Sequence, residues 1–401
     1  MTTTVLVINK TLSSHAPSNL SGVIADAKSE SVPCIRQHAA EHVNDAVGSL
    51  PDCDEDVRDA LLLRGIPWWC TEAINLPATE FFVVNDRQQR LHLRFSWPPS
   101  SPESVLLVLH GYGAHSNRPP FRALCEAFVA EGIGVISLDF HGHGYSEGER
   151  AFVESPSHLV DDALCALLAF CSPQSLACKM AHSGANVRRI FVMGHSMGGG
   201  TALVVANILQ HGARALCKTE FFTTHEAAFA RDVCLLFRGV MCLCPVSGGA
   251  VLPSLARAAV DGVLWMFPRS SVPAEIMDEN STNCQVWASD EYRRYIEADG
   301  FPANPSGLSF GANMRFGTIL SVLSLGDLVR ATVTQASFPF LILHDPRNDV
   351  ILPFEGSLAF VVDAPASDKE LVTLASAWHD PLANRPVTVI KILRDWILAR
   401  V

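Results

Sequence analysis

The stretch from Arg188 to Ala206 constrains the fold of this chain more than any other. It reads RRIFVMGHSMGGGTALVVA, an apolar run, then the pentapeptide Gly194 to Gly198, then small apolar residues. The first part fits a buried strand and the last part fits a closely packed helix. A strand, a tight G-x-S-x-G turn and a helix together lift a serine hydroxyl above the end of a parallel strand. Ser196 is therefore the candidate nucleophile.

The pentapeptide alone is a weak signal, because the chain contains 26 glycines in 401 residues. A second match, Gly144 to Gly148, follows His141-Gly142-His143 instead of an apolar run and leads into Glu149-Arg150. Its surroundings lack the strand and the helix that the turn requires. We therefore interpret Ser146 as a loop serine.

Short apolar runs recur along the chain, and most are separated by segments long enough for a helix. This alternation predicts a mostly parallel sheet, whose active groups lie beyond the carboxyl ends of the strands. Ahead of the runs, Phe81 to Val84 and Leu91 to Phe95 flank Asn85-Asp86-Arg87 and predict an antiparallel hairpin. The runs are Val105 to Leu109, Gly134 to Leu138, Ile190 to Met193, Val240 to Leu243 and Phe340 to Leu343.

A nucleophilic serine needs a base to accept its proton and an acid to orient that base. Asp349, shortly after the last of these runs, is the candidate acid, and Asp345 is a nearer rival. With the chain order serine, acid, histidine, the base is His379, the only histidine after Asp349. The alternative for His379 is a capping or surface histidine, because Asp380-Pro381 directly after it makes a plausible exposed turn.

The reaction also creates an oxyanion, which needs preorganised backbone N–H donors. One candidate is the amide of Met197, directly after the nucleophile. The other is the amide of Tyr112, in His110-Gly111-Tyr112-Gly113 after the run Val105 to Leu109. For His110, a role in supporting this loop is favoured over a role as ligand or base.

Composition excludes several classes of protein. Hydrophobic residues make up 48% of the chain and charged residues 18%, which fits a globular protein, and the net charge of -11 argues against nucleic-acid binding. Apolar stretches such as Leu159 to Cys171 are interrupted by charge, so we predict no transmembrane segment. Val5 to Ile8 lacks a preceding basic residue, which is atypical of a secretory signal. We predict a cytoplasmic protein.

Twelve cysteines are scattered along the chain without C-x-x-C pairs or histidines at zinc spacing. They read as reduced, mostly buried small hydrophobes. We assign no disulfide framework, no metal and no organic cofactor.

The chain divides into four predicted parts. Residues 1–70 form an N-terminal extension, expected to be partly disordered, with a short helix near 54–63. Residues 71–246 and 336–401 form the two parts of the core, and residues 247–335 form an inserted lid. Within the lid, Leu252 to Phe267 has a broad apolar helical face, which fits either a helix packed on its neighbours or contact with lipid. Met314 to Leu328 predicts a second helix.

Several motifs together resemble the monoglyceride lipase branch of the α/β-hydrolases, which is grouped with serine aminopeptidase-like hydrolases. The resemblance covers roughly residues 75–401, and it departs from the family in the long lid and in insertions near 171–186 and 210–238. The matching motifs are His110 to Ser116, Asp139 to Gly148, Gly194 to Gly199 and the segments around Asp349 and His379.

The resemblance implies an α/β-hydrolase fold, with a mostly parallel central sheet flanked by helices and an inserted helical lid. The lid would shape an apolar channel for an acyl chain and dock on membrane surfaces. The implied reaction is hydrolysis of a monoacylglycerol or similar lipid ester through an acyl-enzyme, without a cofactor. Its residues would be Ser196 as nucleophile, Asp349 as acid, His379 as base, and the amides of Tyr112 and Met197 as the oxyanion hole.

Two other hypotheses remain. The same apparatus serves a lysophospholipase, an acyl-thioesterase or a general carboxylesterase, because the lid decides which acyl group enters. A catalytically idle hydrolase fold kept for protein or membrane contact belongs to a different class, and the presence of all three triad residue types argues against it. Nothing in the sequence marks a peptidase site for a free amino terminus.

Overall fold

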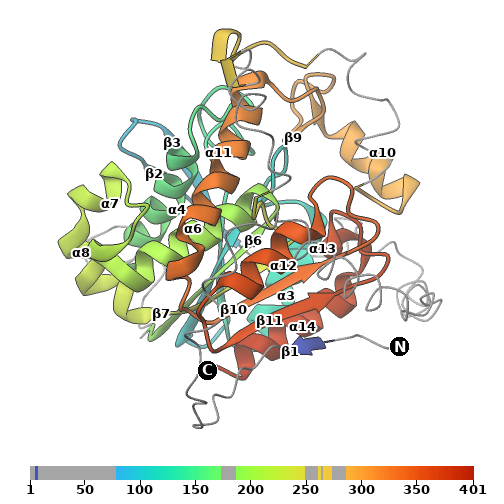
Figure 1. The fold of residues 1–401 in the computed structure, drawn as a ribbon. Coiled ribbons are helices and arrows are strands. Elements are labelled where there is room, and N and C mark those ends of the chain that lie inside the picture. Colours follow the sequence, from blue (N-terminus) through green and yellow to red (C-terminus); the bar gives the residue numbers. More distant parts are fainter. Residues whose placement is uncertain (1–4, 8–77, 173–186, 249–260, 263–264, 273–285) are drawn as a thin grey trace, which may run out of the picture.

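A twisted sheet with helices on both faces forms the centre of the molecule (Figure 1). The computed structural model describes residues 5–7, 78–172, 187–248, 261–262, 265–272 and 286–401. The strands of the sheet are β1 Val5–Val7, β2 Ala78–Val84, β3 Arg90–Ser96, β4 Ser104–Leu109, β5 Gly134–Leu138, β6 Arg189–His195, β7 Phe237–Leu243, β10 Phe340–His344 and β11 Lys369–Thr373. Their order across the sheet is β1-β11-β10-β7-β6-β4-β5-β3-β2.

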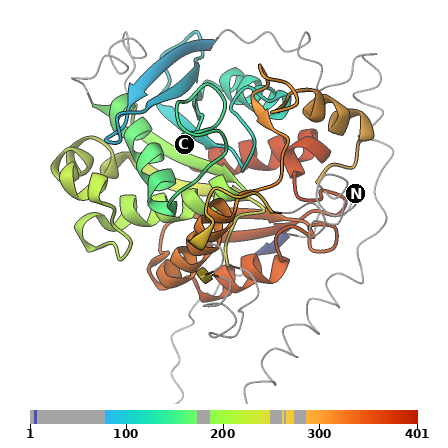
Figure 2. The same ribbon diagram turned by 90° about the horizontal axis from the view of Figure 1, so that it is seen from above.

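The six central strands, from β11 to β5, run parallel, and antiparallel strands close both edges. The predicted hairpin is β2–β3, which pairs Phe81 with Leu93 and lies on the rim of the molecule in Figure 2. The predicted apolar runs all fall within strands. The structure thus confirms the α/β-hydrolase fold class, with a mostly parallel sheet between helical layers.

Buried side chains alternate between the two faces of the sheet, as the period of two in a strand requires. In β4, Val105, Leu107 and Leu109 join the core beneath one helical layer, while Leu106 and Val108 join the core beneath the other. The first layer includes α4 Pro156–Cys171, α6 Met197–His211, α11 Phe316–Thr332 and α12 Phe354–Asp363. The second includes α3 Pro119–Ala130, α13 Pro381–Asn384 and α14 Pro386–Leu398.

Most of the predicted N-terminal extension lies outside the described residues, including the predicted helix near 54–63. Its one described part is β1, which pairs antiparallel with β11 at the edge of the sheet, with Leu6 opposite Leu371. Residues 210–238, predicted as an insertion, contain α7 Glu220–Thr224, α8 Glu226–Asp232 and the short 3-10 turns Gly212–Arg214 and Cys234–Leu236.

The predicted lid interval, 247–335, is described only in part. Its described elements are α10 Asp290–Ala298, the two-stranded pair β8 Gly300–Phe301 and β9 Ser309–Phe310, and α11. Of the apolar stretch Leu252 to Phe267, positions 261–262 and 265–266 are helical and the others up to 264 lie outside the described residues. The predicted second helix is α11, which contacts α6 and α4 of the core layer. The boundaries of the four parts remain a prediction.

One helix in the described part of the chain, Phe316–Gln335, has the length and apolar composition of a membrane span. It consists of α11 and the turn that follows it, and it packs on the core. Leu325 and Val329 are fully buried, and the Ser321 hydroxyl donates to the Val153 carbonyl at 2.8 Å. Length and composition alone do not distinguish a core helix from a span. The packing on α6 and α4 explains why one side of this helix is apolar.

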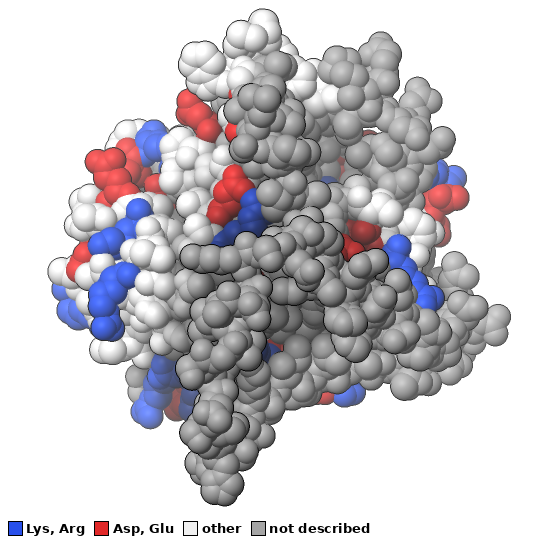
Figure 3. Space-filling view, in the orientation of Figure 1, with Lys and Arg blue, Asp and Glu red and all other residues white. Residues whose placement is uncertain are grey.

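Charged side chains of both signs lie next to one another over the described part of the face in Figure 3. Lys and Arg are interspersed with Asp and Glu there, and neither sign forms a continuous field. The described part of this face therefore shows no basic surface of the kind that nucleic acids bind.

Candidate active site

Ser196 occupies a strained turn between β6 and α6. Its backbone angles, φ 54° and ψ -115°, are rare for a residue with a side chain. A β-carbon on Gly194 would overlap the Gly198 carbonyl, and one on Gly198 would overlap the Leu109 carbonyl. Only glycine fits at both positions. The pentapeptide therefore forms the elbow that the sequence predicts.

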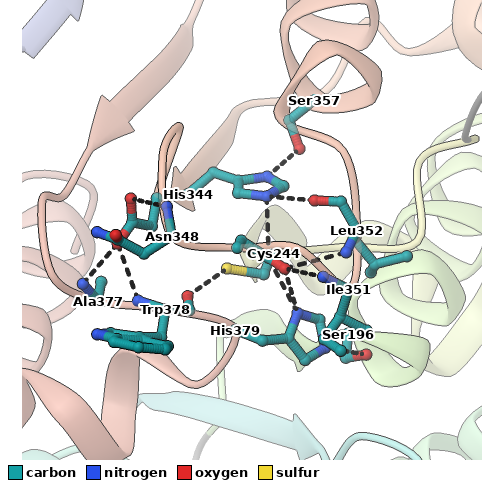
Figure 4. A network of polar contacts seen from close by, with 12 residues as sticks. Ser196, Cys244, His344, Asn348, Ile351, Leu352, Ser357, Ala377, Trp378 and His379 are labelled. Carbon is teal, nitrogen blue, oxygen red and sulfur yellow. Dashed lines mark hydrogen bonds and ion pairs between the residues drawn. The ribbon is translucent and has the colours of Figure 1, made fainter. Parts of the chain in front are cut away.

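The structure brings Ser196, His379 and Asp349 together from three separate loops (Figure 4). Nε2 of His379 lies 2.9 Å from Oγ of Ser196, and Nδ1 lies 2.9 Å from Oδ2 of Asp349. Asp349 follows β10 and His379 follows β11, so the three side chains meet beyond the carboxyl ends of parallel strands. Because the carboxylate only accepts, Nδ1 carries the proton and Nε2 accepts from the serine hydroxyl.

The carboxylate of Asp349 is buried and ionised. Its Oδ1 accepts the main-chain N–H groups of Ile351 and Leu352, each at 3.0 Å. Burial alone would raise the pKa of this carboxyl, but hydrogen bonds from His344 and then His379 outweigh it and hold the pKa well below its usual value. The acid is thus prepared to stabilise a positive charge on the histidine.

Asp345, the rival acid, has different partners. Its carboxylate accepts N–H groups from its own loop, at Arg347 and Asn348, and from the loop of the histidine, at Ala377 and Trp378. The last two distances are 2.8 and 2.9 Å. We call residues 345–353, between β10 and α12, the acid loop, and residues 374–380, between β11 and α13, the histidine loop. Asp345 therefore ties the acid loop to the histidine loop, while Asp349 contacts the imidazole itself.

The predicted oxyanion loop, residues 110–118 between β4 and α3, lies directly against Ser196. A β-carbon on Gly111 would stand 3.2 Å from Cβ of Ser196. Met197 is the first residue of α6, so its amide belongs to the positive end of a helix. The Tyr112 ring packs edge-on against His143 and Phe310. Both predicted amides thus belong to segments that adjoin Ser196.

His110 supports this loop, as the sequence favoured. Its Nε2 accepts the N–H of Phe140 at 3.1 Å, and its Nδ1 donates to the Gly111 carbonyl at 2.7 Å. Burial lowers the pKa of His110 to about 4, so the ring is neutral at pH 7 and can accept at Nε2.

Asp139 anchors the oxyanion loop through hydrogen bonds to its carboxylate, a role that the sequence analysis missed. Its buried carboxylate accepts the N–H of Ser116 at 2.6 Å, the N–H of Tyr145 at 3.0 Å and Nδ1 of His92 at 2.9 Å. Ser146, from the second G-x-S-x-G match, donates to the Asp139 carbonyl at 2.5 Å. Ser146 therefore has a structural role in this loop.

Part of the insertion joins the oxyanion loop. Arg118 is buried and donates to the Gly113 carbonyl at 3.0 Å and to Ser309 Oγ at 3.1 Å. The Gly113 carbonyl also accepts the N–H of Phe310 at 2.9 Å. Beside them, Nε2 of His115 lies 3.2 Å from the Asp299 carboxylate.

The same part of the insertion also joins the histidine loop. Nε1 of Trp287 donates to Asp380, the neighbour of His379, at 3.1 Å, and the side chain of Asn384 bonds to the main chain at Val286 and Ala288. We call residues 286–310 the strap, because they connect both loops. No spacing in the sequence signals these pairs, since the partners are up to 191 residues apart.

Cys244 and His344 stand beside Asp349. In the part of the chain that the structure describes, these three form the one group whose side chains could hold a metal, with ligand atoms within 4.8 Å of one another. His344 is hydrogen-bonded to Asp349, and Asp349 to His379. Hydrogen bonding thus accounts for the cluster. The sequence analysis did not single out His344.

Comparisons with known proteins show which hydrolases this chain resembles. Residues 100–218 match the family described as serine aminopeptidase, S33. The chain is 24% identical over 305 residues to human monoglyceride lipase, covering 74% of this chain and 82% of that protein. It is 24% identical over 310 residues to the monoacylglycerol lipase of Mycolicibacterium smegmatis, covering 75% and 90%.

Among solved structures, a soluble variant of the monoglyceride lipase of Saccharomyces cerevisiae shares the fold. Its TM-score is 0.55 at 19% identity, over 82% of this chain and 96% of that one. Structural likeness at this identity establishes only the fold. The matched family and the relatives named above add that the chain resembles monoglyceride lipases. This chain is a monoglyceride lipase-like α/β-hydrolase and, by class, a serine hydrolase.

Proposed function

We propose that this enzyme hydrolyses carboxylic esters of lipids, with monoacylglycerol as the preferred substrate and glycerol and a fatty acid as the products. The observation that carries the proposal is the continuous set of hydrogen bonds from Ser196 through His379 to Asp349 at the elbow. Supporting it, curated relatives that match three quarters of the chain are named monoglyceride or monoacylglycerol lipases.

The proposed reaction begins when Oγ of Ser196 attacks the ester carbonyl carbon. The serine proton passes to Nε2 of His379 as the bond forms, and Asp349 stabilises the resulting imidazolium. The amides of Met197 and Tyr112 stabilise the tetrahedral oxyanion. The carbon–oxygen bond to glycerol then breaks, and His379 returns its proton to the departing alkoxide. A water molecule repeats the sequence on the acyl-enzyme and releases the fatty acid.

Peripheral contact with a lipid surface is part of the proposal. Trp265, Met266 and Phe267, in the insertion, are exposed by 74%, 59% and 55%. Three consecutive large apolar side chains facing solvent favour contact with another apolar surface, and tryptophan favours the membrane interface. They would bring the enzyme to its substrate in lipid.

The test combines labelling with substrate preference. A fluorophosphonate probe followed by mass spectrometry should label Ser196, and Ser196→Ala should lose the label and lower ester hydrolysis on the order of 10⁶-fold. A panel of monoacylglycerol, lysophospholipid and acyl-thioester should show monoacylglycerol turned over most efficiently. Preference for another member of the panel would replace the substrate assignment, and an unlabelled, inactive folded protein would contradict the enzyme assignment.

A further inference from the structure

A second histidine contacts the carboxylate that orients the first. His344 is the last residue of β10, and its side chain is 0% exposed. Its Nε2 lies 3.0 Å from Oδ2 of Asp349 and 3.1 Å from the Leu352 carbonyl, and its Nδ1 lies 2.8 Å from Oγ of Ser357 in α12. These bonds can be followed in Figure 4.

The partners of His344 fix which ring nitrogen holds the proton. Nε2 faces two groups that can only accept, the Asp349 carboxylate and the Leu352 carbonyl, so it must carry hydrogen. Nδ1 faces the Ser357 hydroxyl, which can donate to it. His344 is therefore a donor to Asp349 while its ring is neutral. The ring of Phe354 packs edge-on against the imidazole of His344, with 5.6 Å between the two ring centroids.

Two imidazoles thus share one carboxylate oxygen. Oδ2 of Asp349 receives Nε2 of His344 and Nδ1 of His379, while Oδ1 receives the main-chain donors of the acid loop and a longer contact of 3.1 Å from His379. Other ionisable groups stand nearby. The pKa of the Cys244 thiol is raised first by burial and then by the charge of Asp349, so the thiol is neutral. The ring centroid of His195 lies 5.3 Å from that of His379, and burial lowers the pKa of His195, while the carboxylates of Asp345 and Asp380 act on Cys244 and His195. Among the described residues, His344 and His379 are the two imidazoles that donate to Oδ2.

We propose that His344 is a positioning residue for the hydrolytic reaction: its Nε2–H holds the Asp349 carboxylate in place and moderates the attraction of that carboxylate for a protonated His379. The inference rests on the proposed function, in which Asp349 is the acid and His379 the base. A carboxylate that shares its charge with His344 stabilises the imidazolium less strongly. Without the His344 donor, the Asp349 carboxylate would hold a protonated His379 more strongly.

The decisive experiment compares three variants with the wild type in the pH dependence of kcat/KM, whose acidic limb reports the essential base of the free enzyme. His344→Phe removes the donor, so its acidic limb should move to higher pH by about half to one unit, and its kcat/KM should fall about tenfold. His344→Gln can place an N–H near Asp349 and should return the limb to the wild-type position.

His141→Phe is the matched control. His141 is also a buried histidine bonded to a buried carboxylate, with Nδ1 at 2.6 Å from Asp162, but it lies in a different loop. Its replacement should lower stability while leaving the acidic limb unmoved. If His344→Phe lowers activity with its limb at the wild-type position, His344 is merely structural and the inference is wrong.

Nuclear magnetic resonance of ¹⁵N-histidine provides a readout that does not need activity, and its first part, the tautomer of His344, needs only the wild type. In the wild type, His344 should show the Nε2–H tautomer throughout the range of activity, and an Nδ1–H tautomer would overturn the inference. The His379 resonances should titrate at higher pH in His344→Phe than in His344→Gln. If the wild type neither hydrolyses esters nor takes up fluorophosphonate, the proposed function fails, while the tautomer and the titration still decide the role of His344.

Discussion

At the residue scale, backbone strain is concentrated around the proposed catalytic groups. Of the residues that the structure describes, four non-glycine residues with positive φ lie there: Ser196 at 54°, Cys244 at 41°, Ser376 at 55° and Trp378 at 53°. Conformations of this kind cost on the order of 1–3 kcal/mol each and persist where the surrounding structure imposes them. The Asp345 carboxylate provides part of that support, because it accepts the amide of Trp378.

Replacement of Asp349 and replacement of Asp345 should therefore have different effects on activity and stability. Asp349→Asn should lower kcat about 10⁴-fold, because an amide does not stabilise the imidazolium or hold the imidazole in the required tautomer. Asp345→Asn should lower the melting temperature and reduce kcat by about tenfold through a looser histidine loop. Ester hydrolysis and thermal unfolding of both variants check this. Loss of activity in Asp345→Asn with activity retained in Asp349→Asn would move the acid role to Asp345.

At the scale of elements, the strap is the feature that could not be predicted from the sequence. It contacts the oxyanion loop through Asp299 and Ser309 and the histidine loop through Trp287. Asp299 organises its own end of the strap as well, because its carboxylate accepts the amides of Leu308 and Ser309. This part of the insertion therefore helps to hold the two loops that flank Ser196.

Release of the strap from the oxyanion loop should slow the reaction. Asp299→Ala removes the partner of His115 and the acceptor for Leu308 and Ser309, so kcat/KM should fall about tenfold, on the scale of one lost charge-assisted bond. Esterase kinetics and hydrogen exchange at Gly113 and Ala114 would measure this. Glu291→Ala, in the exposed N-terminal turn of α10, is the control, and an equal effect there would refute a specific role for Asp299.

The exposed apolar residues of the insertion should govern contact with lipid. Trp265→Asp combined with Phe267→Asp should weaken binding to phospholipid vesicles at least tenfold, because each aspartate replaces a large apolar group by a charge. Hydrolysis of a short, soluble ester should stay unchanged. Val387→Asp, an exposed apolar position in α14, is the control. Equal vesicle binding by the wild type and the double variant would contradict docking at this place.

At the scale of the whole molecule, periodic features of the sequence were predictable and long-range pairings were not. Apolar runs such as Val105 to Leu109 predicted strands because burial on both faces of a parallel sheet demands them. The spacing around Ser196 predicted the elbow because sterics leave room only for glycine there. His344, Arg118 and Asp299 escaped prediction, since their roles depend on partners that only the folded chain brings near.

Stability should fall on mild acidification partly because of His110. Burial lowers the pKa of His110 in the folded chain to about 4. Between that pH and the higher pKa of the unfolded state, the unfolded chain binds a proton that the folded chain excludes. Stability from this group is complete above about pH 6.5 and is lost below it at up to about 1.4 kcal/mol per pH unit. Urea unfolding from pH 7 to 5 should show a steeper loss in the wild type than in His110→Gln. Equal slopes would show that the buried His110 does not contribute to the pH dependence of the unfolding free energy.

The place where the insertion leaves the sheet has a consequence for how such an enzyme diversifies. It follows β7, the strand between those that lead to Ser196 and Asp349, so chain added there emerges over the reaction centre without entering the register of any strand. Under the proposed function, the groups that would break the ester bond and the segment that would admit substrate therefore occupy separate stretches of the chain. Exchange of the segment after β7 would then alter specificity while the proposed triad stays in place, which makes this crossing the natural point for grafting a new specificity.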